Sequence, residues 1–258
     1  MSETDFLATA EEAARAAGAV LADWALRFTV REKARADLVT EADVAAQEAI
    51  VAIIRGRYPD HNLLGEENLS RFEHDSPYCW IIDPLDGTSN YVHHFPFYAV
   101  SIGLSRNREL RLGAIYDPNR EEMFSAIRGH GARLNGKRIH PTKVATLSES
   151  LVVASLPVGS SRDDPAVMRF LQVLPNVQSV QRTGSASLNL AYVAAGRIEA
   201  FWSSSLKPWD VAAGAVIVEE AGGRLSKMDG TPFELEVPDV LASNGTDIHQ
   251  QLQQFLAK

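Results

Sequence analysis

An apolar run that ends in two aspartates most constrains what this chain can fold into. The run occupies residues 80–86, WIIDPLD, and closes with Asp83 and Asp86 on either side of Pro84 and one leucine. A short apolar run bounded by turn residues is typical of a buried strand, and α/β proteins place functional loops where such strands end. Two acids this close repel each other unless they bind protons or cations. The pattern therefore predicts a cation site at the end of a buried strand.

Composition and charge bound the classes of protein that this chain can belong to. The 258 residues are 45% hydrophobic and 22% charged, which suits one large domain or two packed halves. The formal net charge of −8 argues against a general attraction to nucleic acid or to an anionic membrane surface. We therefore expect neither partner, and an anionic substrate would need cations in the site.

The single cysteine and the start of the chain indicate a cytoplasmic protein. Cys79 has no partner for an intrachain disulfide, which fits a reducing compartment. The first residues carry acids where a secretory signal would carry bases. No apolar run approaches the roughly 18 residues of a membrane span. We expect a soluble, cytoplasmic protein.

Hydrophobic periodicity predicts helices and strands of an α/β protein. Helices are expected at residues 3–28, 40–57, 165–174, 185–195, 208–221 and from Asp247 onward. Strands are expected near residues 78–82, 98–105, 110–116, 122–127, 151–155, 177–181, 198–202 and 239–243, with a hairpin turn at Asn135-Gly136. No low-complexity linker interrupts the chain. We expect one catalytic unit over 1–258, with a seam near residue 145 between halves of about 1–145 and 146–258.

Acidic residues recur wherever an apolar element ends or a helix begins. The set comprises Glu66, Glu67, Asp83, Asp86 and Asp210. Oxygen ligands without a Cys or His cluster point to Mg²⁺ and not to zinc. Pro84 would stiffen the turn so that both aspartates face one point, and the carbonyl of Leu85 could join the coordination. The sequence therefore predicts a magnesium site.

A glycine and a hydroxyl follow the two aspartates directly. Gly87 would let a phosphate approach the backbone, and N–H groups at a following helix start, from Thr88 onward, would hold its oxygens. Metal ions held by carboxylates supply a Lewis acid and activate water for attack on phosphorus. Together these features predict a phosphatase.

Each acid also has a purely structural interpretation. Asp43 lies three residues after Thr40, as in a capping box at a helix start. Asp210 follows Pro208 in a first helical turn, where the helix dipole favours an acid. Glu66 and its neighbour could simply lie in a solvated loop. The occurrence of all these acids in one chain favours a metal site.

Five segments in a fixed order make the chain resemble the inositol monophosphatase family, which is related in fold to fructose-1,6-bisphosphatase. They are DLVTEAD (37–43), YPDHNLLGEE (58–67), WIIDPLDGTSNYVHHFPFYAVSIGL (80–104), RTGSASLNLAYVAAGRIEAF (182–201) and WDVAAGAVIVEEAGG (209–223). The resemblance covers nearly the whole chain. It implies a layered αβαβα sandwich, a homodimer, two or three Mg²⁺ per active site and sensitivity to lithium.

The resemblance also implies roles for individual residues. The metal ligands would be Glu66, Asp83, the Leu85 carbonyl, Asp86 and Asp210. The pair that orients and deprotonates the attacking water would be Thr88 and Asp43, with Glu67 nearby. Gly87 and Thr88 would hold phosphate, and Gly184, Ser185 and Ala186 would line the leaving-group pocket. Asp86 and Asp210 would also contact the substrate. Lys33 would match a lysine at the edge of the site.

One position departs from the family pattern. Seven residues before Asp210, where inositol-phosphate hydrolases of the family carry a glutamate that accepts bonds from inositol hydroxyls, this chain has Ser203. The substitution leaves the phosphatase chemistry intact and weakens the expectation that inositol phosphate is the main substrate. We expect a small polyol or sugar monophosphate, resembling inositol-1-phosphate.

Several alternatives remain open at the level of sequence. A haloacid-dehalogenase-type phosphatase would carry D-x-D-G-T, but two residues separate the aspartates here. Within the family, the alternatives are a histidinol-phosphatase and a phosphatase of nucleotide 3′-phosphates or fructose-1,6-bisphosphate. A non-catalytic or moonlighting regulatory protein could keep the same fold. The complete ligand set favours catalysis.

Overall fold

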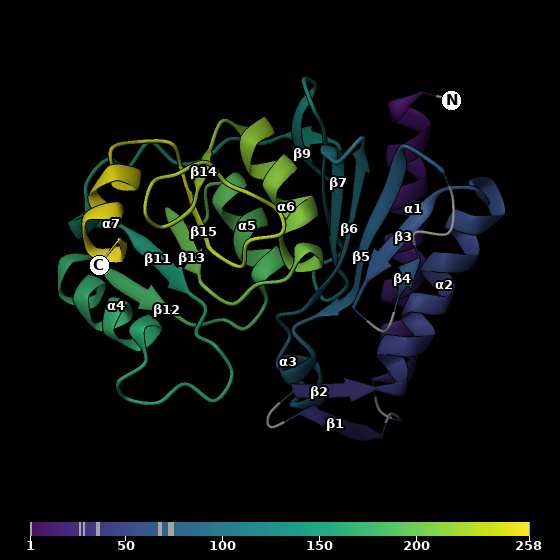
Figure 1. Ribbon diagram of the computed structural model, residues 1–258, viewed down its shortest axis with the longest axis horizontal. Helices are drawn as coiled ribbons and strands as arrows, with labels where there is room; N and C mark the ends of the chain where they lie inside the picture. Colours follow the sequence, from purple (N-terminus) through teal and green to yellow (C-terminus); the bar gives the residue numbers. More distant parts are fainter. Residues whose placement is uncertain are drawn as a thin grey trace.

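The protein folds as a mixed α/β sandwich in which helical layers alternate with two sheets (Figure 1). The computed structural model describes residues 2–25, 27, 29–34, 37–66, 69–71 and 75–257, with the backbone alone at 30–34, 37–39 and 70–71. From one side to the other, the layers are α1 with α2, an eight-stranded sheet, α5 with α6, a five-stranded sheet, and α4 with α7. The predicted αβαβα architecture is confirmed.

Two antiparallel helices, α1 (Glu3–Trp24) and α2 (Glu41–Arg57), cover the outer face of the first sheet. Each begins at a capping box, in which the side chain of Ser2 or Thr40 accepts from the backbone three residues on and an aspartate bonds back. Their small buried alanines pack against Trp80 and the aliphatic residues of the sheet. This layer fixes the start of α2, and with it Asp43.

The first sheet runs in the order β10-β9-β8-β7-β6-β5-β3-β4. Its strands are β3 (Asn62–Gly65), β4 (Ser70–Arg71), β5 (Tyr78–Asp86), β6 (Ala99–Arg106), β7 (Glu109–Asp117), β8 (Glu122–Ile127), β9 (Gly131–Leu134) and β10 (Lys137–Arg138). Only β3 and β5 are parallel neighbours; the other pairs are antiparallel. Between β9 and β10, Asn135 and Gly136 both have positive φ, which confirms the predicted hairpin turn.

The second sheet runs in the order β12-β11-β13-β15-β14. Its strands are β11 (Leu151–Ala154), β12 (Ser179–Gln181), β13 (Ala200–Ser203), β14 (Arg224–Ser226) and β15 (Val240–Ser243). The helices of this half are α4 (Pro165–Val173), α5 (Ala186–Ala194), α6 (Pro208–Ala221) and α7 (Ile248–Leu256), with 3-10 turns η1 (Leu147–Glu149) and η2 (Leu174–Asn176). The chain passes from the first sheet to the second between Arg138 and Leu151, a span that contains the seam proposed near residue 145.

Helix α6 lies directly on the first sheet although it belongs to the second half of the chain. Gly103 and Gly113 are paired across β6 and β7 and present no side chain to the helix. A Cβ added at Gly113 would come within 2.6 Å of the Ala213 Cα, and one at Gly103 within 3.0 Å of the Ala212 Cβ. The absence of side chains at Gly103 and Gly113 therefore lets α6 pack closely against the sheet. This packing fixes the position of the helix that begins just before Asp210.

The structure adds short elements that the sequence patterns did not predict. These are the antiparallel pair β1 (Val30–Ala34) and β2 (Asp37–Thr40), together with β3, β4 and β14. The helix expected to start at Thr88 is α3 (Thr88–Val92), whose end the sequence pattern did not indicate. Strand β5 is also longer than expected and continues through both aspartates. In the part of the chain that the structure describes, no helix is both long enough and apolar enough to span a membrane.

Candidate active site

A bulge at the end of β5 places Asp83 and Asp86 on one side of the sheet. Residues three apart on a regular strand face opposite sides, because side chains alternate. Here Asp83 pairs with Ser101 and Asp86 with Ala99, so an extra residue is inserted in β5. Pro84 is tolerated at this point because the bulge interrupts the ladder, so the N–H that proline lacks is not needed for strand pairing. The predicted convergence of the two aspartates therefore arises from a β-bulge.

Glu66 follows the strand parallel to β5 and so reaches the same edge. Gly65, the last residue of β3, pairs with Ile82, which directly precedes Asp83. The carboxyl ends of parallel strands form the crevice in which α/β proteins bind ligands. Glu67, expected nearby, lies outside the described residues, as does the side chain of Lys33.

The carboxylates of this edge act strongly on one another. Burial raises the pKa of Asp83 well above its usual range, and the charges of Glu66, Asp86 and Asp210 raise it further. Burial and the Asp86 charge raise the pKa of Asp210 to about 8, although the backbone N–H of Lys207 donates to its Oδ2 at 2.7 Å. Four predicted ligands therefore lie within electrostatic reach of one another, and not all can be ionised at neutral pH without a cation.

Asp86 is held by the start of helix α5, about 100 residues later in the chain. Its Oδ2 accepts from the Ser185 hydroxyl at 2.6 Å, from the Ser187 N–H at 2.7 Å and from the Ser187 hydroxyl. Its Oδ1 accepts from the Ala186 N–H at 3.2 Å. Burial raises the pKa of Asp86, while these four donors favour its ionised form. Asp86 thus satisfies N–H groups that the first turn of a helix leaves free.

Thr88 and Asp43 meet as predicted, and Asp43 is also part of a capping box. The Thr88 hydroxyl lies 3.2 Å from Asp43 Oδ1 and 3.1 Å from the Leu85 carbonyl oxygen. The other oxygen of Asp43 accepts from the backbone N–H and the hydroxyl of Thr40, at 2.7 and 2.6 Å. The structural and the functional interpretations of Asp43 are therefore compatible, because each uses a different carboxylate oxygen.

The two halves of the chain touch at Gly87. Its φ of +101° suits glycine, and a Cβ there would meet the carbonyl oxygens of Phe97 and Gly184 at 3.1 and 3.3 Å. The side chain of Asn90 in α3 donates to the carbonyls of Phe97 and Thr183, at 2.6 and 2.8 Å. These contacts bring the expected phosphate residues of the first half beside the expected leaving-group residues of the second.

Ser203 is buried within the protein, whereas the family resemblance implies a residue that lines the substrate pocket. It ends β13, pairs with Val240 and is 0% exposed. Its hydroxyl accepts from the Ser205 N–H at 3.4 Å. Ser185 and Ala186 are likewise engaged with Asp86. The polar groups expected to meet the leaving group are thus already satisfied within the protein.

The donor set suits a hard divalent cation. Carboxylates and a carbonyl oxygen are the ligands that Mg²⁺ prefers, and raised carboxylate pKa values are the cost that a bound cation would relieve. Within the described ranges, no three Asp, Glu, His or Cys side chains are grouped closely enough to hold an ion as they stand. A bound cation would therefore have to draw Glu66, Asp83, Asp86 and Asp210 closer together.

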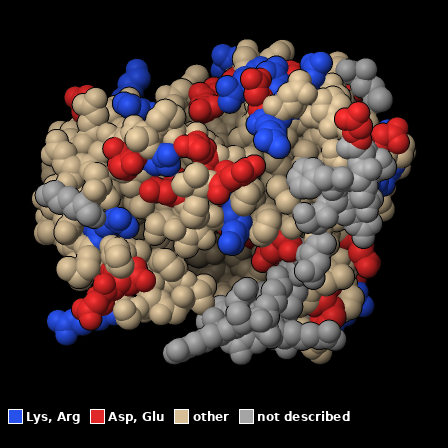
Figure 2. Space-filling model, in the orientation of Figure 1, with Lys and Arg blue, Asp and Glu red and all other residues tan. Residues whose placement is uncertain are grey.

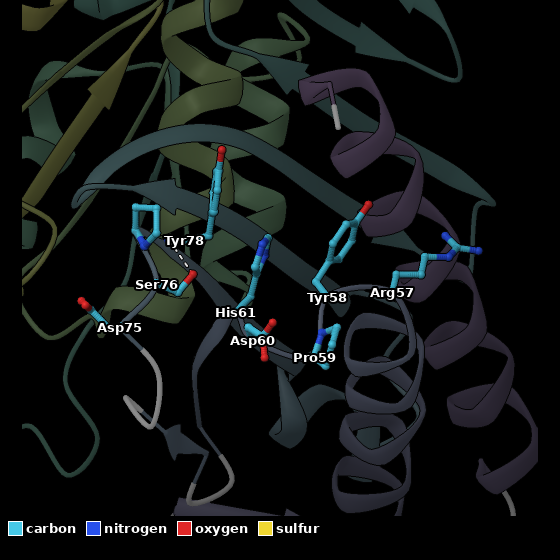
Figure 3. A pocket seen from close by; sticks show the side chains of 9 residues that line it. Arg57, Tyr58, Pro59, Asp60, His61, Asp75, Ser76 and Tyr78 are labelled. Carbon is cyan, nitrogen blue, oxygen red and sulfur yellow. Dashed lines mark hydrogen bonds between the residues drawn. The ribbon is translucent and has the colours of Figure 1, made fainter.

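A separate pocket of about 580 Å³ opens at the far end of β3 and β5 (Figure 3). The His61 ring stacks between Tyr58 and Tyr78, with centroids 4.9 and 4.6 Å away, and its Nδ1 accepts from the Trp80 indole at 3.1 Å. Burial lowers the pKa of His61. The first half of the motif YPDHNLLGEE therefore builds an aromatic stack, and its second half delivers Glu66 to the opposite edge.

The surface seen in Figure 2 carries basic and acidic side chains intermixed, and it is hollowed near the centre. In this view, the described Lys and Arg side chains form no continuous basic area. This distribution is in keeping with the net charge of −8.

Comparison with known proteins agrees with the fold. The model of the inositol monophosphatase family matches residues 2–258. An inositol-1-monophosphatase of Synechocystis is 43% identical over 98% of this chain and 88% of its own length. A Nus factor SuhB of Pseudomonas aeruginosa is 40% identical over 84% of this chain and 82% of its own. The solved inositol monophosphatase of an Anabaena (Nostoc) species has a TM-score of 0.89 at 38% identity, covering 99% and 96% of the two chains.

The layered sandwich of two sheets is the architecture of the solved inositol monophosphatases to which the chain is similar. The chain belongs to the inositol monophosphatase family. It is accordingly a phosphoric monoester hydrolase.

Two residues that hold the site together were missed at the level of sequence. Asn90 links α3 to both halves, and Ser187 anchors Asp86. Their bonds span 93 and 101 positions along the chain, respectively. The only local signal was their place within the motifs DGTSN and GSAS.

Proposed function

We propose that the protein hydrolyses a small polyol or sugar monophosphate resembling inositol-1-phosphate, with Mg²⁺ and an attacking water. The observation that carries this proposal is the contact of the Thr88 hydroxyl with Asp43 and with the carbonyl of Leu85, which lies between Asp83 and Asp86 in the chain. A proton acceptor thus lies next to a place where positive charge is needed. The name of the Synechocystis relative supports the substrate class.

Glu66, Asp83, Asp86, Asp210 and the Leu85 carbonyl would hold two or three Mg²⁺ ions. When bound, Mg²⁺ supplies a Lewis acid for the phosphoryl oxygens and lowers the pKa of water. The protein contributes the positions of these oxygens. A bulge sets the first pair, a parallel strand brings Glu66, and the seated helix α6 brings Asp210.

Thr88 and Asp43 would orient the water and receive its proton. The Thr88 hydroxyl can accept a bond from water while donating its own hydrogen to Asp43 Oδ1. Asp43 cannot rotate away, because its other oxygen is fixed by two donors of Thr40. Glu67, expected nearby, remains part of the proposal.

Gly87 and Thr88, the N-cap and the first residue of α3, would bind the phosphate through close backbone approach. Gly184, Ser185, Ala186 and Asp210 would surround the leaving group. Since the Ser185 hydroxyl and the Ala186 N–H already bind Asp86, they offer the leaving group little directional bonding. We therefore propose modest selectivity among polyol phosphates.

Other features of the proposal rest on the family resemblance. They are a homodimer, inhibition by millimolar lithium and a cytoplasmic location. Phe95 is 53% exposed and is an apolar side chain that a dimer interface would cover. A histidinol-phosphatase activity is the nearest alternative within the family.

A regulatory binding role is the alternative from another class. It is favoured by the name of the Pseudomonas relative, a Nus factor. Such a role does not require the pair of Thr88 and Asp43 to be aligned, and the two residues are within hydrogen-bonding distance. Catalysis is therefore the better-supported proposal.

A phosphate-release assay over a panel of phosphomonoesters tests the proposal. We expect turnover that requires Mg²⁺, with inositol-1-phosphate and other polyol phosphates among the substrates. Asp210→Asn should abolish it while the fold is kept, since removing a repelling charge need not destabilise the protein. Near-normal activity of Asp210→Asn at saturating Mg²⁺ would contradict the site assignment, and an inactive wild type would favour the binding role.

A further inference from the structure

Asp86 accepts four hydrogen bonds from the start of helix α5. Three donors, the Ser185 hydroxyl and both the N–H and the hydroxyl of Ser187, meet on Oδ2. The remaining oxygen, Oδ1, accepts from the Ala186 N–H at 3.2 Å. The two oxygens of this one carboxylate therefore differ in what they can still bind.

An oxygen that already accepts three hydrogen bonds has no lone pair left for a cation. Oδ1 has one weak partner and keeps room for another. The side chain cannot exchange its two oxygens by rotation without breaking the bonds to Ser185 and Ser187. Any cation bound by Asp86 would therefore meet Oδ1 alone.

We propose that Ser187 is a positioning residue that fixes Asp86 as a one-oxygen metal ligand, an inference that rests on the proposed metal-dependent function. Ser187 is 0% exposed, so its hydroxyl cannot contact a substrate. It acts through Asp86 by holding Oδ2 and directing Oδ1. Partners of this kind orient metal ligands, and their loss typically weakens metal binding by about 10- to 100-fold.

Ser187 is a cleaner place to test this role than Ser185. The Ser185 hydroxyl also accepts from the Leu188 N–H at 3.3 Å and so caps helix α5. Its removal would disturb the helix as well as Asp86. Among the described residues, Asp86 is the one hydrogen-bond partner of the Ser187 hydroxyl. Substitution of Ser187 thus removes one donor to Oδ2 and leaves the cap in place.

The experiment measures Mn²⁺ binding directly, by the loss of its electron paramagnetic resonance signal, in the full-length protein without substrate. We expect Ser187→Ala to raise the dissociation constant of the tightest site about 10- to 100-fold. The Mg²⁺ concentration for half-maximal activity should rise in parallel, with kcat at saturating Mg²⁺ changing less than threefold. Ser187→Thr retains the hydroxyl and should restore wild-type binding.

Ser105→Ala is the matched control, because Ser105 is a buried serine on β6 whose hydroxyl donates to a backbone carbonyl away from the carboxylates. Its Mn²⁺ binding should equal that of the wild type. Wild-type Mn²⁺ affinity in a folded Ser187→Ala, or weakened binding in Ser187→Thr equal to that in Ser187→Ala, would overturn the positioning role. If the wild type lacks phosphatase activity yet binds Mn²⁺ in a Ser187-dependent way, the proposed function fails and the positioning role stands.

Discussion

Two clusters of buried titratable groups in this protein have opposite characters. At the end of β5, Asp83 and Asp210 are crowded by other carboxylates, which raise their pKa values. In the second half, His249 is 0% exposed and has a hydroxyl at each ring nitrogen, Ser243 at 2.8 Å and Ser226 at 2.9 Å. The carboxylates of the first cluster raise one another's pKa values, whereas the imidazole of the second is fully hydrogen-bonded within the chain.

The His249 network also fixes the tautomer of the ring. The Ser226 hydroxyl donates to the Lys227 carbonyl, so it accepts from His249 Nε2–H. The Nδ1 then accepts from the Ser243 hydroxyl. Burial, together with the charge of Arg224, lowers the pKa of His249 to about 4. A neutral, fully bonded imidazole contributes to stability, while crowded charges store free energy that a ligand can release.

The largest expected effect comes from breaking the functional cluster. Thr88→Ala removes the hydroxyl that would relay a proton to Asp43, so we expect kcat to fall by roughly 10²–10⁴, with little change in KM. The melting temperature should change little, because Asp43 keeps its two bonds to Thr40. Steady-state kinetics and a thermal melt measure both quantities. A folded variant with wild-type kcat would remove Thr88 from the mechanism.

The complementary change breaks the complete cluster. His249→Ala strands the hydroxyls of Ser226 and Ser243 and leaves a cavity, so we expect a loss of roughly 2–4 kcal/mol in the free energy of unfolding. The kcat of the variant should stay near that of the wild type at temperatures where it is folded. Urea denaturation gives the free energy, and His249→Gln, which can keep one of the two bonds, should lose less. A kcat loss as large as that of Thr88→Ala would contradict the view that the His249 cluster serves stability and not catalysis.

The dependence of stability on pH should separate the two clusters. The unfolded chain binds a proton at His249 near pH 6.5 and the folded chain near pH 4, so the contribution of His249 to stability should rise with pH over this window, by about 3 kcal/mol. Asp210 has the opposite sign. Its folded pKa of about 8 exceeds the usual value of 3.8, so its contribution to stability falls from about pH 4 to pH 8, opposing His249 below pH 6.5 and acting without it above.

Denaturation curves between pH 4 and pH 9 measure these slopes. Mg²⁺ should reduce the fall in stability on the alkaline side, because a bound cation would offset the repulsion between the carboxylates that protons offset at lower pH. Asp210→Asn should reduce this fall without Mg²⁺. A decline that persists unchanged in Asp210→Asn would show that another group is responsible.

The smallest expected effect concerns substrate choice. We expect wild-type kcat/KM for inositol-1-phosphate to exceed that for other polyol monophosphates by no more than about tenfold, or about 1.4 kcal/mol. Ser203→Glu should leave this preference unchanged in any variant that folds, because position 203 is 0% exposed and a side chain there does not reach the leaving group. Ser203→Gln is the control of equal size without the charge. A hundredfold preference in the wild type would mean that another group accepts the inositol hydroxyls.

The sequence predicted the fold better than it predicted the support of the site. Long periodic segments such as 41–57 and 208–221 were located within one or two residues, because their buried faces repeat at helical spacing. Short elements such as β3 and β14 were missed, since three or four residues carry too little pattern. Their existence depends on neighbouring strands far along the chain.

The acids themselves were found from their motifs, but the groups that hold them were not. Asp83 and Asp86 stand out because they follow an apolar run. Ser187 and Asn90 have no such local signal, since their partners are about 100 positions away. Asp43 can both cap helix α2 and contact Thr88, because its two carboxylate oxygens bind different neighbours. The capping interpretation therefore does not exclude the proposed catalytic one.

Helix α6 rests on paired glycines, so the sheet itself, and not a loop, decides where Asp210 lies. The segment around residues 203–207, which precedes this helix, contacts Asp210 through the backbone N–H of Lys207, a bond that does not depend on the identity of a side chain. Its sequence can change over generations without moving the carboxylate, provided that Gly103 and Gly113 are inherited unchanged. A lineage with this arrangement could acquire new substrates through its loops while its reaction chemistry stays the same.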